Sequence, residues 1–576
     1  MSKSWKIKDT PPDEFKTKLA GYHPIIAKLL YNRGLISQSA IDYFFNPEYE
    51  KLYDPFLFTD MEKTVQRIWS AIEKKERILI HGDYDADGVT SAAILSRTLK
   101  LLGAEVEVFI PHREDDGYGL NMENLNNFRV QGTKLLITVD CGITNVQEIA
   151  TLNTMGIDVI VTDHHEPLLE LPDAYAILDP KVDNSGYPFK ELVGAGVAYK
   201  LICGLLTDVS RVPRSTFHVY GGVEGFQKWL LDIVAIGTVA DVAPIIGENR
   251  VLVKWGLKVL EQTRWVGLQK LLESIGSKGI NSFTIGFQIA PRLNAAGRMN
   301  HASVAYELLV SENALEAERI ALELQENNQA RQKVIIKALE EAKLQIESIE
   351  TKKIIFVYDE TWLPGIVGLI AGRLSDEFYR PAIAMTLSNG KVTGSGRSIA
   401  EFNIIQGLHS VNNFFARYGG HAGACGFTLT EIEVREQFEN DFTKHVEKEL
   451  GEIDLRPVLD VDAEIQINQI DFDFLGQLEK FAPFGEGNSK PLFVIRDLKI
   501  AAMDAIGQDQ THLRLSVKQE SPQLYKMLWF GKAKEWLEKL RVGDTIEAVC
   551  ELGINEWNGN REFEFKVVDL KVKCKS

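Results

Sequence analysis

The run from Arg77 to Ser91, RILIHGDYDADGVTS, constrains the fold of this chain more than any other stretch. It places one histidine and three aspartates within seven positions, directly after an apolar segment. Ile78–Ile80 predicts a buried parallel strand, and Gly82 and Gly88 permit the tight backbone that leads into a helix over 92–95. The polar side chains are therefore expected at the carboxyl end of a strand, where open α/β sheets place their sites.

The composition of this loop indicates a metal site. Carboxylates of Asp83, Asp85 and Asp87 suit Mg²⁺ or Mn²⁺, and the imidazole of His81 favours Mn²⁺. A calcium loop of the EF-hand type is an alternative, because the acidic run matches its first half. That alternative fails at the twelfth position, where Ile94 replaces the bidentate glutamate, and because a strand precedes the loop. A solvated acidic turn would explain the aspartates but not His81 or the buried strand.

Short apolar runs alternate with helix-like segments from Arg77 to about Ala243, which is typical of a doubly wound parallel sheet. The strand candidates EVEVFIP, KLLITVDCG, DVIVTDHH and AYAILDP each end in Pro, Gly, Asp or His. The apolar stretch LLDIVAIGTVADVAP is interpreted as a further strand end. A single aspartate after a strand is often only a helix cap. Several such ends on one sheet edge are expected to converge, and they supply these candidate ligands: Asp140, Asp163, His164, His165 and Asp241.

Length and composition limit the remaining choices. At 576 residues the chain is too long for one core, and three or four domains are expected. A net charge of −17 argues against a polyanionic substrate, but a carboxylate-rich site contributes to that total until metals bind. The five cysteines are scattered and never form CxxC, which fits a reducing cytosol and no zinc site. No export signal or membrane span is predicted, so a cytoplasmic location is expected.

Four motifs in the first half, HGDYDADG, VDCG, TDHH and VADV, resemble in sequence and order those of the DHH phosphoesterase superfamily. The superfamily is named for the triplet at 163–165. Further motifs, APRLNAAGRM, GSGRS, YGGHAGACGFTL and FAPFGEGN, resemble the RecJ family of 5′→3′ exonucleases specific for single-stranded DNA. The resemblance covers nearly the whole chain. Its one noticed departure is Cys425 in place of an expected alanine, and both residues are small.

The resemblance implies a multidomain α/β fold. Its expected parts are an N-terminal helical segment (1–70), a parallel-sheet DHH phosphoesterase domain (71–300), connecting helices (301–350), a DHH-associated α/β domain that binds nucleic acid (351–455) and a C-terminal β-barrel of the OB fold (456–576). The residues agree with this division. Dense Glu/Lys pairing around 300–350 predicts a solvated helix or helix pair, and closely spaced strands after Pro457 predict a small barrel. Trp529 and Phe530 are interpreted as core residues of that barrel.

The resemblance also implies phosphodiester hydrolysis with two Mn²⁺ or Mg²⁺ ions about 3.5–4 Å apart. By motif match, one ion is held by His81, Asp85 and Asp140. The other is held by Asp87, Asp140, His164 and Asp241, with Asp140 bridging. Asp83 and Asp163 are expected to orient imidazoles or loops. His165 is expected to contact the scissile phosphate or to assist protonation of the leaving oxygen, so that the predicted catalytic residues are His165, Asp140 and Asp163.

A second group of residues is predicted to bind the DNA strand. GSGRS offers backbone N–H groups, two hydroxyls and a guanidinium, which favours an anion site over a plain glycine turn. The resemblance makes this a pocket for the 5′ phosphate, although the segment PHREDDGYGL could equally be a surface loop. The expected phosphate contacts are Arg113, Ser395, Arg397 and Ser398 at the 5′ end, Arg292 and Arg298 further along the strand, and His421.

The sequence leaves two other functions open. Smaller DHH proteins resemble pyrophosphatases, short-oligonucleotide nucleases or cyclic-dinucleotide phosphodiesterases, but they generally lack the barrel. A catalytically silent single-strand-binding scaffold would be expected to lose metal ligands, and all six candidates are present here. The partners implied by the resemblance are single-stranded DNA, a single-strand-binding protein and a RecQ-type helicase, in DNA repair and recombination. The protein is expected to be a monomer, and no membrane is expected among its partners.

Overall fold

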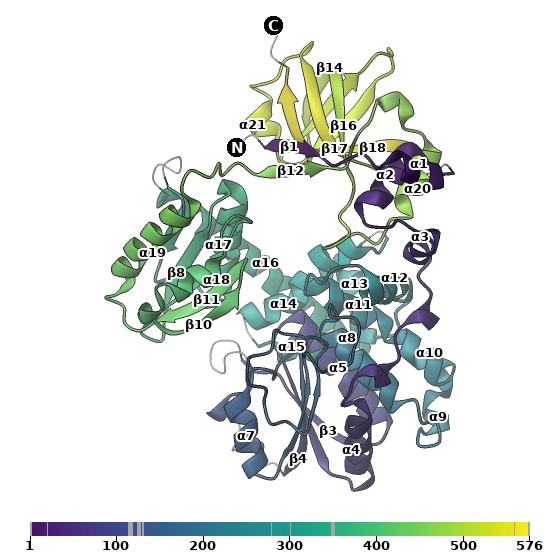
Figure 1. Cartoon of the computed structure of the whole chain (residues 1–576), viewed down its shortest axis with the longest axis vertical. Helices are drawn as coiled ribbons and strands as arrows, with labels where there is room; N and C mark the ends of the chain where they lie inside the picture. The colour runs from purple at the N-terminus through teal and green to yellow at the C-terminus, as the bar shows by residue number, and fades with distance from the viewer. Residues whose placement is uncertain are drawn as a thin grey trace. The chain divides into compact units, whose positions relative to one another are not determined.

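The computed structural model describes residues 3–19, 21–112, 119–123, 128, 132–277, 279–299, 301–346, 352–557 and 559–573. The chain divides into two compact units, one of Tyr49–Leu455 and one that combines Met1–Glu48 with Arg456–Ser576 (Figure 1). Each unit is described here by itself. Among the helices of the described residues, none combines the length and apolar character that crossing a bilayer requires.

The larger unit begins with the five-stranded parallel sheet that the apolar runs predicted, in the order β3-β2-β4-β5-β6. Its strands are β2 (Arg77–Gly82), β3 (Glu105–Phe109), β4 (Thr133–Val139), β5 (Asp158–Thr162) and β6 (Ala176–Leu178). Ile78 and Ile80 pack into a core on one face, and Leu79 packs into a separate core on the other. Because both faces are covered, these strands are apolar without alternation.

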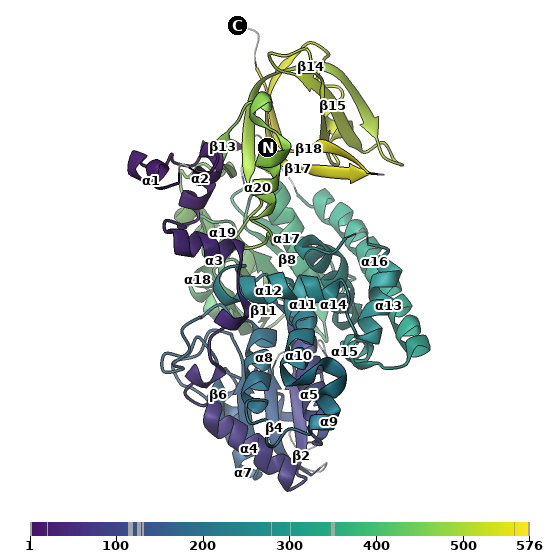
Figure 2. The ribbon, with the colours of Figure 1, turned by 90° about the vertical axis from the view of Figure 1, so that its right-hand side faces the viewer.

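Helices cover both faces of this sheet (Figure 2). The strands are contacted by α4 (Met61–Glu73), α5 (Ala86–Leu101), α7 (Val146–Thr154) and α8 (Gly194–Leu205). The helices α9 (Arg214–Phe217), α10 (Gly222–Trp229), α11 (Leu231–Ala240) and α12 (Gly247–Leu260) follow, and α11 packs on α5 and α8. The interpretation of the stretch before Asp241 as a strand end was wrong, because that stretch is helix α11. It is apolar all round because α5, α8 and α12 pack against it, and apolar content without periodicity does not distinguish a buried helix from a buried strand.

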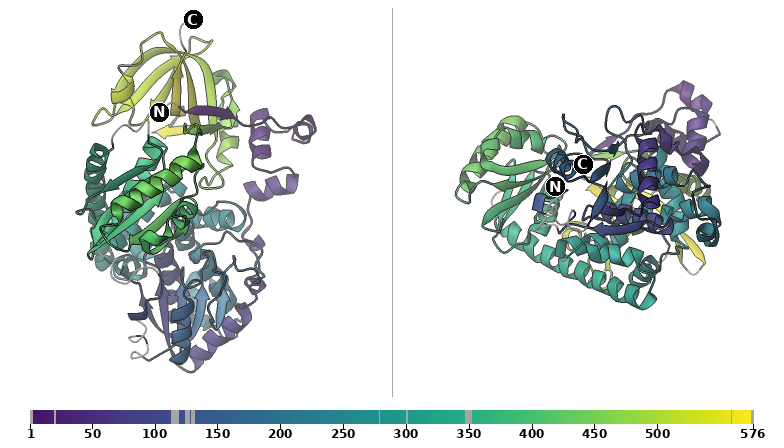
Figure 3. Two further views of the ribbon diagram at one scale, coloured as in Figure 1. Left: turned by 60° about the vertical axis from the view of Figure 1, so that its left-hand side comes forward. Right: turned by 90° about the horizontal axis from the view of Figure 1, so that it is seen from below.

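A helical region follows, and it links the first sheet to a second one. It consists of α13 (Val266–Ile275), the π-helix η4 (Thr284–Ile289), α14 (Ala290–Met299), α15 (Ser303–Val310) and α16 (Ala314–Leu344). The first half of α16 packs through Ile320 and Leu324 into the core of the first sheet's helices. Its second half packs through Ala338 and Ala342 against the second sheet's helix α17 (Pro364–Phe378). Seen from below in Figure 3, α16 extends from one group of helices to the other.

The second sheet has the order β10-β11-β9-β8-β7, with only β7 and β8 parallel. Its strands are β7 (Ile355–Tyr358), β8 (Ala382–Ser388), β9 (Lys391–Arg397), β10 (Phe415–His421) and β11 (Ala424–Leu429). One face packs against α17, and the other packs against α18 (Ile404–His409) and α19 (Arg435–Leu450).

The GSGRS motif is the end of strand β9 and not the turn that its glycines suggested. Its glycines are required by packing within the sheet. A Cβ at Gly394 would lie 2.4 Å from the ring of Phe427, and one at Gly396 would lie 2.7 Å from the Sγ of Cys425. Glycine in a strand interior often marks such a close approach.

The smaller unit holds the predicted barrel. Strands β13 (Ala463–Glu464), β14 (Leu492–Ile506), β15 (His512–Lys518), β16 (Tyr525–Trp529), β18 (Asn560–Val572) and β17 (Thr545–Trp557) follow one another, and β17 pairs again with β14 to close the barrel. Trp529 is a core residue as predicted, at 5% exposed. The same prediction for Phe530 was wrong, because its side chain is 52% exposed and its ring lies at the end of β16, 5.1 Å from that of His512.

The N-terminal segment of the chain is part of this smaller unit. Strand β1 (Ser4–Ile7) pairs in parallel with β12 (Val458–Val461). The helices α1 (Asp13–Lys18), α2 (Pro24–Asn32) and α3 (Gln38–Phe45) share a core with α20 (Phe472–Glu479), and α21 (Ala533–Trp536) completes the helices of the unit. Helix α2 ends before the left-handed Gly34 (φ 72°), which follows its C-cap.

Candidate metal centre and nucleic-acid interface

The acidic loop after β2 is fixed by its own backbone. Asp85 is the N-cap of α5, and its carboxylate accepts the N–H groups of Asp87 (2.9 Å) and Gly88 (3.2 Å). A Cβ at Gly88 would lie 2.5 Å from the carbonyl oxygen of Asp83, so only glycine permits this close turn. The loop therefore turns sharply and brings its carboxylates together at the end of the strand.

Asp87 is buried and held by the start of α8. Its two carboxylate oxygens accept the backbone N–H groups of Gly194 (2.7 Å) and Ala195 (2.9 Å). A Cβ at Gly194 would lie 2.6 Å from the Cβ of Asp140, and one at Gly237 would lie 2.6 Å from Asp87 Oδ1. The motifs did not indicate these small residues, although a glycine inside the apolar run of α11 was an available signal.

The structure brings ligand atoms from the loop and three further segments into three groups, within each of which the atoms lie within 4.8 Å of one another. These groups are Asp140 with His164 and His165, Asp87 with His164 and Asp241, and Asp83 with Asp85 and Asp140. His164 Nε2 lies 3.0 Å from Asp140 Oδ1 and 3.8 Å from both Asp87 Oδ2 and Asp241 Oδ2. The groups share members, so they form one continuous cluster.

Asp140 is central to this cluster. It is 2% exposed, and its φ of 62° is one that residues with a side chain rarely adopt. Strain of this kind is typical of functional positions. Its N–H donates to the carbonyl of Thr162 at 3.0 Å, which fixes it beside the end of β5.

His81, predicted to be a ligand of the first ion, lies near the end of β2. The ring is buried against Phe109 and Phe128, and Nδ1 lies 3.7 Å from Cys141 Sγ. His81 is outside the three groups, whereas Asp83, expected to play an orienting role, belongs to one of them.

The carboxylates of the cluster repel one another. Burial, and then the negative charge of Asp87, raises the pKa of Asp140 well above its ordinary value. Burial and the charge of Asp241 do the same to the pKa of Asp87, and burial with the charge of Asp85 raises the pKa of Asp241 to about 7. Bound divalent cations would remove this repulsion. A donor set of carboxylate oxygens with imidazole nitrogen fits Mn²⁺ or Mg²⁺.

The two adjacent histidines differ in charge. Burial and the neighbouring charge of His165 lower the pKa of His164 to about 3, so its imidazole is neutral and can bind a metal. Burial also disfavours charge on His165, but the contact of its Nδ1 with Asp163 Oδ1 (2.8 Å) outweighs burial and raises its pKa to about 9. His165 is therefore a cation at neutral pH. Asp163 is fixed in turn by the N–H groups of His164 (2.7 Å) and Ile143 (2.9 Å).

A further acidic group follows β6, the strand that the sequence AYAILDP predicted. Asp179 is buried, and its Oδ1 accepts the N–H of Lys181 at 2.8 Å. Burial, and then the charge of Asp163, raises the pKa of Asp179 to about 7. The ammonium of Lys181 lies 3.2 Å from Glu166, just past the two histidines. No motif had singled out either residue.

Two of the residues predicted to bind the 5′ phosphate, Ser395 and Arg397, lie on strand β9 of the second sheet. Arg397 Nη1 donates to the carbonyl of Gly396 (2.9 Å) and lies 3.3 Å from Ser395 Oγ. Gly368 of α17 faces this pair, since a Cβ there would lie 3.1 Å from Ser395 Oγ and 3.4 Å from Arg397 Nη2. Ser398 turns away into its own loop, where its hydroxyl donates to the carbonyl of Phe402 at 2.6 Å.

The other predicted phosphate contacts are distributed over the same unit. His421 is exposed, and its pKa is lowered by partial burial and then by the charge of Arg397. Arg292 Nε donates to Gln325 Oε1 at 2.6 Å. Arg298 Nη1 donates to the carbonyl of Gly365 at 2.8 Å, which joins α14 to the start of α17. Arg113 lies outside the described residues.

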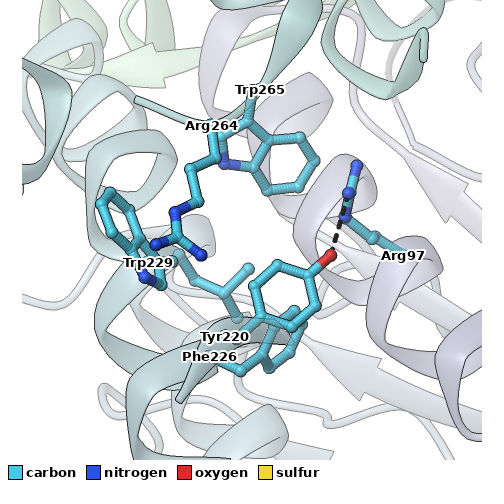
Figure 4. A pocket seen from close by; sticks show the side chains of 7 residues that line it. Arg97, Tyr220, Phe226, Trp229, Arg264 and Trp265 are labelled. Atoms are coloured by element: carbon cyan, nitrogen blue, oxygen red, sulfur yellow. Dashed lines mark hydrogen bonds between the residues drawn. The ribbon is translucent and has the colours of Figure 1, made fainter. Parts of the chain in front are cut away.

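A small surface pocket lies at the other end of α5 (Figure 4). The guanidinium of Arg264 lies 4.1 Å from the ring centre of Trp229, and that of Arg97 lies 4.5 Å from the ring centre of Trp265. Tyr220 points its hydroxyl at Arg97, 3.1 Å away. Arg97 is ten residues beyond Asp87, about 15 Å along the helix axis, so this pocket is separate from the carboxylate cluster.

Three family models match the chain in the order of its folded parts. The DHH family, N-terminal domain, matches residues 77–238, the DHHA1 domain matches 351–452, and the RecJ OB domain matches 461–569. The first match spans the carboxylate cluster except Asp241. The second contains Ser395 and Arg397.

Similar proteins extend the likeness over the whole chain. The single-stranded-DNA-specific exonuclease RecJ of Bacillus subtilis (strain 168) is 37% identical over 99% of this chain and 71% of that protein. The crystal structure of RecJ from Thermus thermophilus in complex with Mn²⁺ aligns with a TM-score of 0.83 and 29% identity, over 100% of this chain and 80% of that one. The Mg²⁺ complex of the same protein aligns at 0.75 and 28% identity, over 100% and 79%.

Proposed function

The chain belongs to the RecJ family of single-stranded-DNA-specific exonucleases, and from this premise we propose that it hydrolyses single-stranded DNA from the 5′ end to 5′-mononucleotides. The observation that carries the proposal is the buried cluster of carboxylates and imidazoles at the carboxyl end of the parallel sheet. A silent scaffold would have no need to keep five mutually repelling carboxylates in one place. The barrel and the Ser395–Arg397 pair support a polynucleotide substrate over a small cyclic or inorganic one.

The proposal includes two ions, Mn²⁺ or Mg²⁺, because RecJ structures contain each metal and the donor set here suits both. Asp85 and Asp140 with His81 would hold one ion. Asp140, as the bridge, would hold the other together with Asp87, His164 and Asp241. The grouping of Asp83 with Asp85 and Asp140 supports a direct place for Asp83 at the first ion. When bound, such ions activate a water and neutralise charge on the phosphoryl oxygens.

The chain's own catalytic residues follow from the charge difference between the histidines. His165 is protonated at neutral pH and lies beside Asp140, 4.0 Å from its Oδ1, so it can contact the scissile phosphate and donate a proton to the leaving oxygen. Asp163 positions the imidazole through Nδ1 and keeps it charged. Neutral His164 stays available as a ligand.

The 5′ preference is proposed to come from Ser395 and Arg397, with Arg113 as a further contact. The guanidinium of Arg397 and the hydroxyl of Ser395 are adjacent, as a terminal phosphate requires. Arg298, Arg292 and His421 would contact phosphates elsewhere on the strand. The hydroxyl of Ser398 serves its own loop and its backbone N–H donates to the carbonyl of Gly423 (2.9 Å), so Ser398 is given no direct phosphate contact in the proposal.

The remaining parts of the proposal rest on family membership. They are a role in DNA repair and recombination, a cytoplasmic location, action as a monomer, and contacts with a single-strand-binding protein and a RecQ-type helicase. Pull-down of each partner with the full chain, and light scattering for the oligomeric state, test these points independently of catalysis.

The deciding experiment is digestion of single-stranded DNA labelled at either end, in Mn²⁺, beside a blunt duplex. Release of mononucleotides from the 5′ end of single strands alone is the expected result. Release from the 3′ end would overturn the role of Arg397 while leaving the metal cluster in place. Cleavage confined to oligomers of a few nucleotides would favour the short-oligonucleotide class instead.

A further inference from the structure

Helix α16 was predicted to be only a solvated connector, and most of its charged residues fit that description. Arg319 pairs with Glu323 (3.1 Å), Lys337 with Glu341 (3.6 Å), and Lys343 with Glu377 (2.7 Å). Arg331 differs from them. Within the described ranges, no carboxylate oxygen lies within 4 Å of its guanidinium.

The guanidinium of Arg331 is also only partly satisfied. Its Nη2 donates to Asn328 Oδ1 at 2.8 Å, but its Nε is buried and has no hydrogen-bond acceptor among the described residues. A buried donor without an acceptor is costly, and more so when it belongs to a charged group. This donor of a charged group is therefore left without an acceptor from the described part of the chain.

Two other arginines lie on helices that pack against α16. Arg292 of α14 donates its Nε to Gln325 of α16 and, like Arg331, has no described carboxylate within 4 Å. Arg373 belongs to α17, which packs along the second half of α16 through Ile370 and Val334. Arg331 is three residues before Val334 and Arg373 three residues after Ile370, so both lie at the contact of the two helices. We refer to Arg292, Arg331 and Arg373 as the arginine cluster.

The electrostatics of Arg331 agree with this placement. Burial, and then the positive charges of Arg373 and Arg292, lower the pKa of Arg331 from its ordinary value. Three like charges destabilise one another when, as among the described residues, no carboxylate pairs with them. A phosphate between them would reverse the sign of each interaction, and guanidinium groups match its oxygen atoms well.

The arginine cluster adjoins the residues already proposed to bind the strand. On α17, Gly365 contacts Arg298, while Gly368 and Gly372 face Arg397. Arg373 follows directly, five residues or about 7.5 Å along the axis from Gly368. One helix thus connects the 5′-phosphate residues to the arginine cluster.

We propose that Arg331 and Arg373, together with Arg292, bind a backbone phosphate of the substrate strand beyond its terminal nucleotide. This inference rests on the proposed function, because it assigns the phosphate to single-stranded DNA. It gives α16 a part in substrate binding in addition to its connecting role.

The test compares Arg331→Gln and Arg373→Gln with Arg319→Gln, a matched control on an exposed, ion-paired position of the same helix. Binding of a 5′-phosphorylated, fluorescent 20-nucleotide strand is measured by anisotropy in EDTA over a range of KCl concentrations. Each test variant is expected to weaken binding about tenfold and to reduce the slope of log K against log salt by about 0.7, the loss of one phosphate contact. Arg319→Gln is expected to bind like the wild type.

Turnover in Mn²⁺ separates this inference from the proposed function. The loss in both test variants should appear in KM for the 20-mer more than in kcat, and Arg331→Lys should recover part of it.

Unchanged affinity and salt slope in both glutamine variants would overturn the inference while wild-type digestion still supported the function. An equal loss in Arg319→Gln would overturn it as well, since general helix charge would then suffice. If wild type and control both failed to digest the strand, the proposed function itself would fail. Arg373 is exposed, so its variant keeps the test valid if Arg331→Gln unfolds.

Discussion

The carboxylate cluster and the arginine cluster lie in one unit of the molecule but are built in opposite ways. In the first, negatively charged side chains meet because their backbone segments converge at the end of one sheet, and Asp85 and Asp140 are fixed by loop geometry. The second gathers positive charge from three helices that are distant in sequence. The difference shows that convergence at a sheet edge places the acidic side chains, whereas helix packing places the arginines that are proposed to bind DNA.

Both clusters leave their charge unbalanced by the protein. In the first, burial and mutual repulsion raise the pKa values of Asp87, Asp140 and Asp241. In the second, burial and neighbouring guanidinium groups lower the pKa of Arg331. Each imbalance fits a partner of opposite sign, cations in one case and phosphates in the other. The net charge of −17 therefore says little about the substrate.

The largest expected effect comes from the carboxylate cluster. Asp140→Ala should reduce Mn²⁺-dependent digestion by more than about 100-fold, since even substitutions outside the metal's direct ligands cost up to about that much. Asp183→Ala, an exposed aspartate of the same sheet region, is the control and should retain full activity. Quantified release of labelled nucleotide measures both. Retained metal-dependent activity in Asp140→Ala would refute the assignment of the cluster.

The second-largest effect is expected at the residues proposed to bind the 5′ phosphate. Arg397→Ala should lower the preference for 5′-phosphate over 5′-hydroxyl ends by about 10–100-fold, because a charge-assisted hydrogen bond contributes about 1.5–3 kcal/mol. Competition between the two substrates measures the ratio. Arg417→Ala, at an exposed position on strand β10 of the same sheet, should leave it unchanged. An unaltered ratio in Arg397→Ala would mean that the 5′ phosphate is bound by other residues.

A smaller effect is expected on the pH dependence of activity, and it distinguishes His165 from the predicted metal ligands. The pKa of His165 is about 9 in the folded protein because of Asp163, so activity that needs the protonated form should decline above that pH. Asp163→Asn removes the charge, and the descending limb of the pH–rate profile should move toward the ordinary value of about 6.5. An Asp173→Asn control on an exposed loop should keep the limb near 9. A limb that stays in place in Asp163→Asn would contradict the role of His165 as a proton donor.

The smallest effect is on stability without metal. The folded pKa of Asp241, about 7, is above its unfolded value of about 3.8, so its contribution is present at low pH and is lost as pH rises through about 7. In EDTA, Tm should therefore fall between pH 5 and 8. Mn²⁺ should raise Tm more at pH 8 than at pH 5, by about 1 °C for each kcal/mol gained in a unit of this size. Asp241→Asn should flatten this difference. Calorimetry showing an equal rise at both pH values would contradict the repulsion argument.

The accuracy of the sequence predictions followed how local each signal was. The strands of the first sheet and the barrel were predictable because apolar runs and turn residues act over a few positions. The stretch before Asp241 was misread because a helix buried on all sides has no periodicity. The place of GSGRS in a strand was not predictable, because its glycines serve contacts with Phe427 and Cys425, which lie about thirty residues away in the chain. Phe530 was misplaced because alternation at a strand end depends on where the strand stops.

The sequence by itself determined the family, the strands of the first sheet and the residue types of the carboxylate cluster, because carboxylates and histidines at strand ends must converge when the strands are parallel. Only the tertiary structure decided that Asp83 rather than His81 joins Asp85 and Asp140 in a group, that Gly194 and Gly237 make room for Asp87, and that Arg331 meets Arg292 and Arg373. These facts depend on side-chain packing between segments far apart in the chain. No pattern of spacing along one element encodes such contacts.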